Sequence, residues 1–124
     1  MSKTILVIED DSFLRELEHK KLTEKGYTVF SAENSAQAFE ILNGATKVDL
    51  VLLDLLLPEV DGFTILKEIR DNKNLSGTPV IIFSNLYEEK DAKQANKLGI
   101  TDYMLKSNFT LDELAEKVKK FIGE

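Results

Sequence analysis

Residues 51–62, VLLDLLLPEVDG, form a long apolar stretch that one aspartate, Asp54, interrupts. Residues 50–54 show no alternation of apolar and polar side chains, which predicts a strand that is buried on both faces. A carboxylate at the end of such a strand either caps the backbone or takes part in chemistry. The segments on both sides of the stretch decide between these two interpretations.

Segments typical of strands and of helices alternate along the whole chain. Apolar or β-branched runs predict further strands at residues 4–8, 27–31, 79–84 and 101–105. Helical spacing predicts helices at residues 13–25, after Asn34, from Phe63 to Ile69, at residues 88–98 and from Thr110. Five strand–helix units in a row predict an α/β fold, in which helices cover both faces of a five-stranded parallel sheet.

Capping signals mark several helix ends. Asp11 or Ser12 is expected to begin the first helix, and Gly26 to follow its last turn in the left-handed conformation. Thr110 and Glu113 have the spacing of a capping box. The apolar residues that we expect on the inner helix faces are Leu14, Leu17 and Leu22, then Ala38, Phe39, Ile41 and Leu42, and finally Leu111, Leu114, Val118 and Ile122.

Composition narrows the class of protein. The 124 residues fit one domain, residues 1–124, and the absence of cysteine excludes thiol catalysis, zinc–thiolate sites and disulfides. The net charge is −6, with 16 basic residues scattered among 22 acidic ones, so we expect no direct contact with nucleic acid. We find no signal peptide and no apolar run long enough to span a bilayer, and therefore expect a cytoplasmic protein without membrane insertion.

Polar residues gather where the predicted strands end. In parallel α/β sheets, ligands bind beyond the carboxyl ends of the strands. The residues expected at this edge are Glu9, Asp10 and Asp11 after the first strand, Asp54 after the third, Ser84 and Asn85 at the fourth, and Lys106 and Ser107 after the fifth. Each of them alone could be an ordinary cap or surface residue, but their convergence on one edge favours a functional site.

Carboxylates brought together in one crevice repel each other and require a cation between them or a change of protonation. Oxygen ligands of this kind suit Mg²⁺. With Lys106 and the Ser84 hydroxyl beside it, such a site could neutralise a phosphoryl group in transfer. Asp54 would then be the attacking carboxylate, and the product would be an aspartyl-phosphate.

With these residues in place, the chain resembles a response-regulator receiver domain of the single-domain, chemotaxis-regulator kind. The resemblance covers essentially the whole sequence and rests on ILVIEDD, LLDLLLPEVDG, PVIIFS and DYMLKS in that order. It implies a flavodoxin-like (βα)5 sandwich and a phosphorylation-activated switch of a two-component system. A histidine kinase or histidine phosphotransfer protein would donate the phosphoryl group in a Mg²⁺-dependent reaction.

The resemblance also implies roles for single residues. Asp54 would be the phosphoacceptor, and Mg²⁺ would be bound by Asp10, Asp54 and the backbone carbonyl of Leu56, with Glu9 acting through a water molecule. The groups expected around the phosphoryl group are Lys106 as its cation, Ser84 as the switch hydroxyl and Tyr103 as the switch aromatic. Leu56 and Leu86, two residues beyond Asp54 and Ser84, are expected to hinder hydrolysis by excluding water.

The output that the resemblance implies is protein binding. The fourth helix, fifth strand and fifth helix would form the face that binds a downstream protein, and the chain would be a monomer or a phosphorylation-dependent dimer. It would be no enzyme beyond catalysing its own phosphorylation and dephosphorylation. Since the chain ends directly after the last predicted helix, no output domain is expected unless the sequence is an excised domain.

Two positions depart from the usual pattern of the family. Glu9 stands in place of an aspartate, and Ser107 stands where proline usually follows the lysine. The family's proline favours a cis peptide bond, whereas a cis bond before serine costs about 3–4 kcal/mol. We therefore predict a trans bond between Lys106 and Ser107.

Other classes of protein fit less well. A docking module that has lost phosphorylation on the same fold remains open as the main alternative. A flavodoxin-like electron carrier would need a Ser/Thr/Gly-rich phosphate loop where EDDSF stands, and a haloacid-dehalogenase phosphatase would need an aspartate at Leu56. His19, next to Glu18 and Lys20 in the first predicted helix, is expected to be exposed and not to act as a ligand or phosphocarrier.

Overall fold

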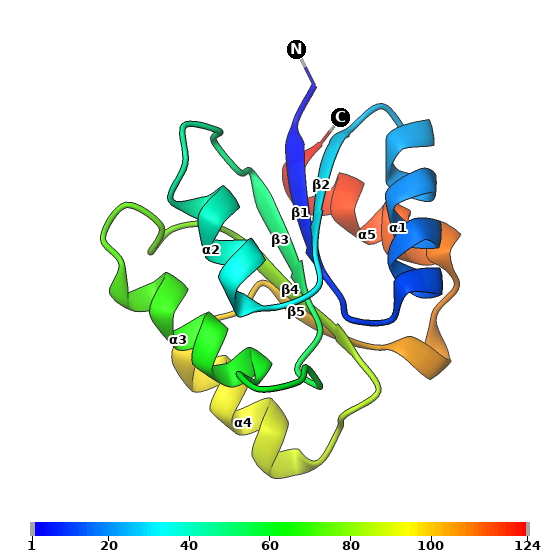
Figure 1. The fold of residues 1–124 in the computed structure, drawn as a ribbon. Helices are drawn as coiled ribbons and strands as arrows, with labels where there is room; N and C mark the ends of the chain where they lie inside the picture. The colour runs from blue at the N-terminus through cyan, green and yellow to red at the C-terminus, as the bar shows by residue number, and fades with distance from the viewer. Residues whose placement is uncertain (1, 124) are drawn as a thin grey trace.

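A computed structural model describes residues 2–123 and contains one parallel sheet of five strands, in the order β2-β1-β3-β4-β5 (Figure 1). The strands are β1 Thr4–Ile8, β2 Thr28–Ala32, β3 Leu50–Leu53, β4 Val80–Ser84 and β5 Asp102–Leu105. The helices are α1 Ser12–Glu24, α2 Ser35–Leu42, α3 Gly62–Asp71, α4 Glu89–Leu98 and α5 Leu111–Ile122, with a short 3₁₀ turn at Lys106–Asn108. The predicted α/β fold is confirmed, and the strand and helix bounds differ from the predictions by a residue or so.

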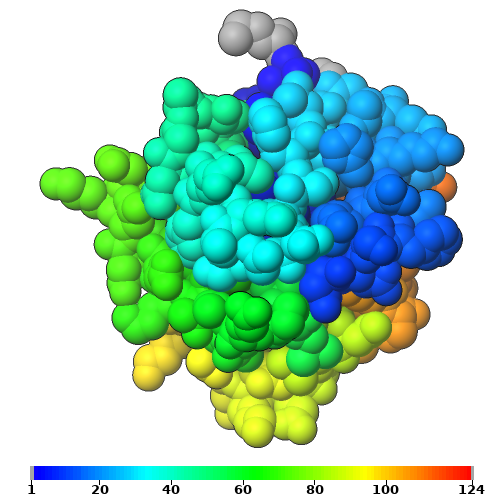
Figure 2. All heavy atoms as spheres, in the orientation of Figure 1, coloured from blue at the N-terminus to red at the C-terminus, as the bar shows by residue number. Residues whose placement is uncertain are grey.

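The sheet separates two apolar clusters. Alternate residues of β1 point to opposite faces, so Leu6 and Ile8 pack with α2, α3 and α4, whereas Ile5 and Val7 pack with α1 and α5. Figure 1 shows the same division, with α1 and α5 on one side of the sheet. In the space-filling view, α1, α2 and α3 in blue, cyan and green cover the face turned to the viewer (Figure 2). No helix among residues 2–123 is long and apolar enough to cross a membrane.

The predicted caps are confirmed. Asp11, rather than Ser12, is the N-cap of α1, because its Oδ1 accepts a hydrogen bond of 3.1 Å from Leu14 N. Gly26 follows α1 with φ of 101°, the left-handed conformation that glycine adopts without strain. The Thr110–Glu113 capping box opens α5. Asp11 and Thr110 thus fix the starts of α1 and α5, shortly after the ends of β1 and β5.

The inner face of α1 differs from the prediction. Leu17 was expected in the core, but its side chain is 38% exposed, while Glu18 is only 2% exposed. Leu22 is fully buried, and the residue one turn before it on the same face is Glu18. The spacing of Leu22 therefore turns Leu17 to the side of the helix, and a carboxylic acid occupies the inward position.

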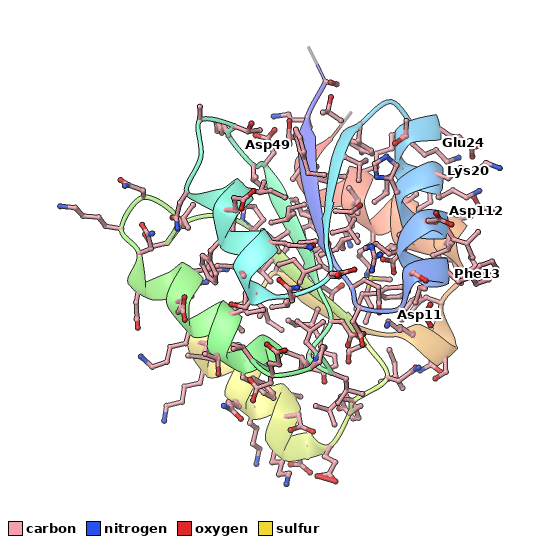
Figure 3. The ribbon with its side chains drawn as sticks, viewed as in Figure 1. Asp11, Phe13, Lys20, Glu24, Asp49 and Asp112 are labelled. Atoms are coloured by element: carbon pink, nitrogen blue, oxygen red, sulfur yellow. The ribbon has the colours of Figure 1, made fainter. Side chains whose placement is uncertain are left out.

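Acidic residues lie at both ends of the sheet and form different contacts. Asp11, at the start of α1, and Asp49, just before β3, lie at opposite ends of the sheet (Figure 3). Asp49 Oδ2 accepts a hydrogen bond of 2.8 Å from Thr4 N and so ties the entrance of β3 to β1. Asp112 pairs with Lys21 at 2.9 Å and joins α5 to α1. The acidic residues at the carboxyl ends of the strands form hydrogen bonds and ion pairs with other residues.

Candidate functional site

The register of the strands brings the predicted site residues together. Ile8 pairs with Leu53, so Glu9 and Asp54, the residues that follow them, leave neighbouring strands at the same edge. Ser84 ends β4 and pairs with Leu105 of β5, so Lys106 emerges beside it. The carboxyl edge of the sheet thus collects side chains that lie far apart in the sequence.

Asp54 is buried, 5% exposed, and both of its carboxylate oxygens are bound. Oδ1 accepts hydrogen bonds from Ser84 Oγ at 2.6 Å and from Leu56 N at 3.0 Å. Oδ2 accepts one from Lys106 Nζ at 2.7 Å. The bond from Leu56 is a local turn contact, but the hydroxyl and the ammonium come from other strands. Asp54 is therefore a carboxylate oriented by a site rather than a cap alone.

An acidic pair stands next to Asp54. Glu9 is 2% exposed, with Oε1 2.5 Å from Lys106 Nζ and Oε2 accepting a hydrogen bond of 3.1 Å from Asp11 N. Asp10 is exposed. Each of Glu9, Asp10 and Asp54 offers one carboxylate oxygen, and these oxygens all lie within 4.8 Å of one another.

This donor set fits a hard divalent cation. Three carboxylates face a single ammonium, that of Lys106, so negative charge is left over at the edge of the sheet. Like charges this close repel unless a cation or a proton lies among them. Carboxylate oxygens with one exposed member, which leaves room for water, match the ligands that Mg²⁺ prefers.

Burial and pairing act in opposite directions on Lys106 and Glu9. Burial alone lowers the pKa of Lys106, but its hydrogen bonds to Asp54 and Glu9 outweigh this effect and raise the pKa above its ordinary value. Burial raises the pKa of the Glu9 carboxyl, and the Lys106 ammonium opposes that rise. The lysine is thus kept charged, as a group that balances acids or phosphoryl oxygens must be.

A hydrogen-bonded path leads from Asp54 to Tyr103. Ser84 Oγ, which donates to Asp54, accepts a hydrogen bond of 3.2 Å from Leu86 N. The carbonyl of Leu86 accepts the hydroxyl of Tyr103. The ring of Tyr103 meets Tyr87 edge to face, with ring centroids 5.5 Å apart. The loop after β4 therefore joins the predicted switch hydroxyl to the predicted switch aromatic.

The loop between β3 and α3 is tightly built. Glu59 has φ of 65°, and Val60 N donates to Pro58 O at 2.7 Å, which closes a three-residue turn. A Cβ on Gly62 would lie 2.6 Å from the backbone oxygen of Asp54 and 2.6 Å from Leu55 Cα. Only glycine fits there, so the start of α3 packs directly on the backbone that carries Asp54.

Two residues at the site were not anticipated from the sequence. Arg15 Nη1 donates to the carbonyls of Glu9 at 2.9 Å and of Asp10 at 3.3 Å, which holds the acidic turn against α1. Glu18, buried on the same helix, feels the charges of Glu9, Lys106 and Asp54. Arg15 binds backbone carbonyls, which no sequence pattern marks, so its role could not be identified from the sequence.

The remaining predicted positions lie near the edge with different exposure. The side chain of Leu56 is 51% exposed, whereas Leu86 is half-buried against the apolar cluster beneath α3 and α4. No cis peptide bond occurs in residues 2–123, so the predicted trans bond between Lys106 and Ser107 is confirmed. His19 is exposed, and its Nδ1 lies 3.1 Å from Ser31 Oγ.

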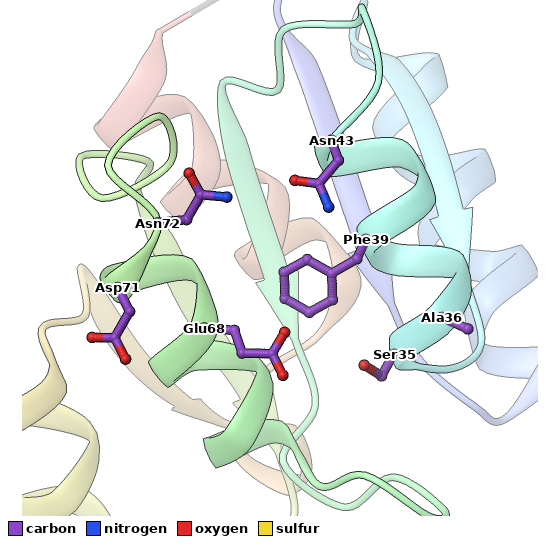
Figure 4. A pocket seen from close by; sticks show the side chains of 7 residues that line it. All are labelled: Ser35, Ala36, Phe39, Asn43, Glu68, Asp71 and Asn72. Carbon is purple, nitrogen blue, oxygen red and sulfur yellow. The ribbon is translucent and has the colours of Figure 1, made fainter.

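A groove lies between α2 and α3, away from these strand ends (Figure 4). It has a volume of about 450 Å³, and Phe39 lines it together with Glu68 and Asp71. No cation is among its lining residues, so a phosphoryl group would meet repulsion there. The carboxyl edge of the sheet, where Lys106 and Ser84 bind Asp54 beside two further acids, is the candidate site.

Comparison with known proteins gives a consistent result. The family model of the response regulator receiver domain matches residues 5–119. The chain is 39% identical to the transcriptional regulatory protein CrdR of Helicobacter pylori over 124 residues, which is 100% of this chain and 57% of that protein. The chain thus spans little more than half the length of this relative.

A second relative is matched along most of its length. The sporulation initiation phosphotransferase F of Bacillus subtilis is 34% identical over 123 residues, which cover 98% of this chain and 95% of that protein. Among solved structures, the phosphorylated cyanobacterial phytochrome response regulator RcpA superposes with a TM-score of 0.87 at 26% identity, over 98% of this chain and 94% of the other. The chain belongs to the response regulator receiver domain family.

Proposed function

We propose that this receiver domain accepts a phosphoryl group on Asp54 from a phosphohistidine of a histidine kinase or phosphotransfer protein. The observation that carries the proposal is the environment of the Asp54 carboxylate, which is buried between Ser84, Lys106 and the acidic pair. Receiver domains are signalling switches that interact with such kinases, and they are not ordinarily classed as enzymes. The family and the site therefore support the same reaction.

In the proposed transfer, a carboxylate oxygen of Asp54 attacks the phosphorus atom, a P–O bond forms and the P–N bond to histidine breaks. Lys106, which now binds both Asp54 and Glu9, would turn its ammonium to a phosphoryl oxygen. The Ser84 hydroxyl would do the same with its proton. Both donors are already in place, so little rearrangement opposes the step.

Asp10, Asp54 and the backbone carbonyl of Leu56 would hold Mg²⁺, with Glu9 acting through water. The cation would supply neutralising charge for the phosphoryl oxygens. Hydrolysis would return the switch to rest, and we assign to Leu56 and Leu86 the role of keeping water from the phosphorus atom. The domain would thus control its own dephosphorylation.

We propose output by protein binding through the face formed by α4, β5 and α5, as a monomer or a phosphorylation-dependent dimer, in the cytoplasm. Tyr103 belongs to this face and is joined to Asp54 through Leu86 and Ser84. A change at Asp54 therefore has a physical route to the surface. Phosphorylation can shift this surface only by the contacts that differ between the two states.

Incubation with Mg²⁺ and acetyl phosphate, followed by intact mass measurement, tests the proposal. The expected result is one added phosphoryl group, which Asp54→Asn abolishes and Glu16→Gln, a change on the exposed side of α1, retains. If the parent protein and Glu16→Gln both fold but neither gains mass, the chain is a docking module that works without phosphorylation.

A further inference from the structure

Asp91, in the first turn of α4, stands out among the buried polar groups. Asp91 is 7% exposed, and its Oδ2 has no hydrogen-bond partner. Within residues 2–123 it is the sole buried side-chain oxygen or nitrogen without one. A buried polar atom left without a partner costs free energy, on the order of 1–3 kcal/mol, and more for a charged group. A carboxylate kept in such a position requires an explanation.

The surroundings of Asp91 point to Tyr103. Asp91 lies one turn before Ala95 on the buried face of α4, and Tyr103 packs against the apolar cluster that contains Ala95. Apart from burial itself, the charge of Asp91 is the strongest influence that raises the pKa of the Tyr103 phenol, to about 12. Tyr87 and Asp54 act on that phenol in the same direction but less strongly. Among the neighbouring charged groups, Asp91 therefore has the largest effect on the pKa of the Tyr103 phenol.

The hydroxyl of Tyr103 is engaged elsewhere in this structure. It donates to the carbonyl of Leu86, whose amide donates to Ser84, which in turn donates to Asp54. These bonds link the Tyr103 hydroxyl to Asp54 through the loop after β4. A withdrawal of Ser84 that carried Leu86 with it would leave the half-buried phenol in need of another acceptor.

We propose that Asp91 is a positioning residue of the switch and that its Oδ2 is the second acceptor of the Tyr103 hydroxyl. The inference rests on the proposed function, since it describes how the two states of that switch differ. In the state described above, Tyr103 binds the Leu86 carbonyl and Asp91 Oδ2 has no hydrogen-bond partner. In the other state, Ser84 is released from Asp54 and Tyr103 donates to Asp91.

This exchange makes Asp91 oppose activation. The cost of its unpaired oxygen falls only on the state in which Ser84 binds Asp54, so removal of the carboxylate favours that state. Asp91→Ala removes the acceptor, whereas Asp91→Asn keeps a weaker, neutral acceptor oxygen. Glu89→Gln is the matched control, because it removes one negative charge from an exposed side chain in the same turn.

The test is a double-mutant cycle with Tyr103→Phe, read through the binding of beryllofluoride and Mg²⁺ as a phosphoryl mimic. We expect Asp91→Ala to tighten binding about fivefold or more, a coupling typical of allosteric sites. Asp91→Asn should have an intermediate effect and Glu89→Gln none. In the Tyr103→Phe background, Asp91→Ala should leave the affinity unchanged. An equal effect of Asp91→Ala with and without the Tyr103 hydroxyl overturns the proposal.

A second measurement needs no phosphoryl mimic. The chain has no tryptophan and three tyrosines, so carbon-13 labelling of the tyrosine rings gives few NMR signals. We expect Asp91→Ala to shift the Tyr103 signal and to lower the pKa of its phenol, with both properties partly restored in Asp91→Asn. If the mimic fails to bind but these changes occur, the proposed function fails and the contact stands. If the mimic binds and the Tyr103 signal does not respond, Asp91 has no part in the switch.

Discussion

The ammonium of Lys106 lies 2.5 Å from Oε1 of Glu9 and so joins the acidic pair to the phosphoacceptor candidate, Asp54, which the same ammonium binds at 2.7 Å. Through this contact Glu9, although longer than an aspartate, has a cationic partner within the site. The exposed side chain of Asp10, in contrast, forms no salt bridge within residues 2–123. The two acids should therefore respond differently to neutralisation.

Mg²⁺ affinity tests this difference. Asp10→Asn should weaken binding by roughly tenfold or more, because a carboxylate ligand becomes a neutral amide. Glu9→Gln should weaken it less, since we assign to Glu9 a contact through water and its charge is shared with Lys106. Titration followed by tyrosine fluorescence gives both values, with Glu16→Gln as control. Equal losses in the two variants would contradict the assigned roles.

The lifetime of the phosphoryl group should depend on Leu56. Its side chain is 51% exposed and is therefore not held as core packing. Leu56→Asn would place a group able to orient a water molecule near the phosphorus atom, and we expect hydrolysis about tenfold faster, which corresponds to about 1.4 kcal/mol in the barrier. The decay of phosphorylated protein after removal of the donor measures the rate. An unchanged rate would mean that the leucine does not shield the site.

Stability should depend on pH through Glu18. Burial raises the pKa of the Glu18 carboxyl from 4.5 to about 8, with the charge of Glu9 acting in the same direction. The folded state therefore keeps a proton that the unfolded state releases, and the free energy of unfolding falls as pH rises from about 4.5 to about 8. Glu18→Gln should remove this loss, which amounts to roughly 5 kcal/mol at about 1.4 kcal/mol for each pKa unit.

Urea unfolding at pH 5 and at pH 8.5, in the presence of a chelator, measures the effect. The advantage of Glu18→Gln over the parent protein should be large at the higher pH and should fall to about 1 kcal/mol or less at the lower one. Glu16→Gln, on the exposed side of α1, should follow the parent at both. An advantage of Glu18→Gln that is independent of pH would indicate better packing rather than titration.

Gly62 should be essential for the position of Asp54. In Gly62→Ala the new Cβ would meet backbone atoms of Asp54 and Leu55 at 2.6 Å, so α3 or the strand end must shift. We expect a loss of about 1–3 kcal/mol in stability and slower phosphorylation by acetyl phosphate. Gly77→Ala is the control, because a Cβ there has nothing within 4 Å. Similar stability of the two variants would show that the loop yields without cost.

The sequence was sufficient for the sheet and for most of the candidate site. Apolar runs ending in Glu9, Asp54, Ser84 and Lys106 predict parallel strands, and parallel strands bring their ends together without further information. The trans bond after Lys106 also followed from local chemistry. These features depend on periodicity and on covalent geometry, both of which can be read from a single chain.

The misplaced features depend on tertiary contacts. Leu17 and Glu18 are neighbours, and hydrophobicity alone favours the leucine in the core. However, Leu22 is buried, and the helix position one turn before it on the same face is that of Glu18, so the glutamate points inward. Arg15 reaches the carbonyls of Glu9 and Asp10, groups that every residue has and that no sequence pattern marks. The burial of Asp91 with an unpaired Oδ2 likewise depends on how α4 packs on the rest of the fold, which no local pattern shows.

The position of the phosphoryl group tests the central claim most directly. Borohydride reduces an aspartyl-phosphate to homoserine, so peptide mapping after treatment with Mg²⁺, acetyl phosphate and borohydride identifies the modified residue. We predict homoserine at position 54 in the parent protein and none at that position when Mg²⁺ is removed by a chelator. Modification at another residue, or full phosphorylation of Asp54→Asn, would contradict the assignment of Asp54 as phosphoacceptor.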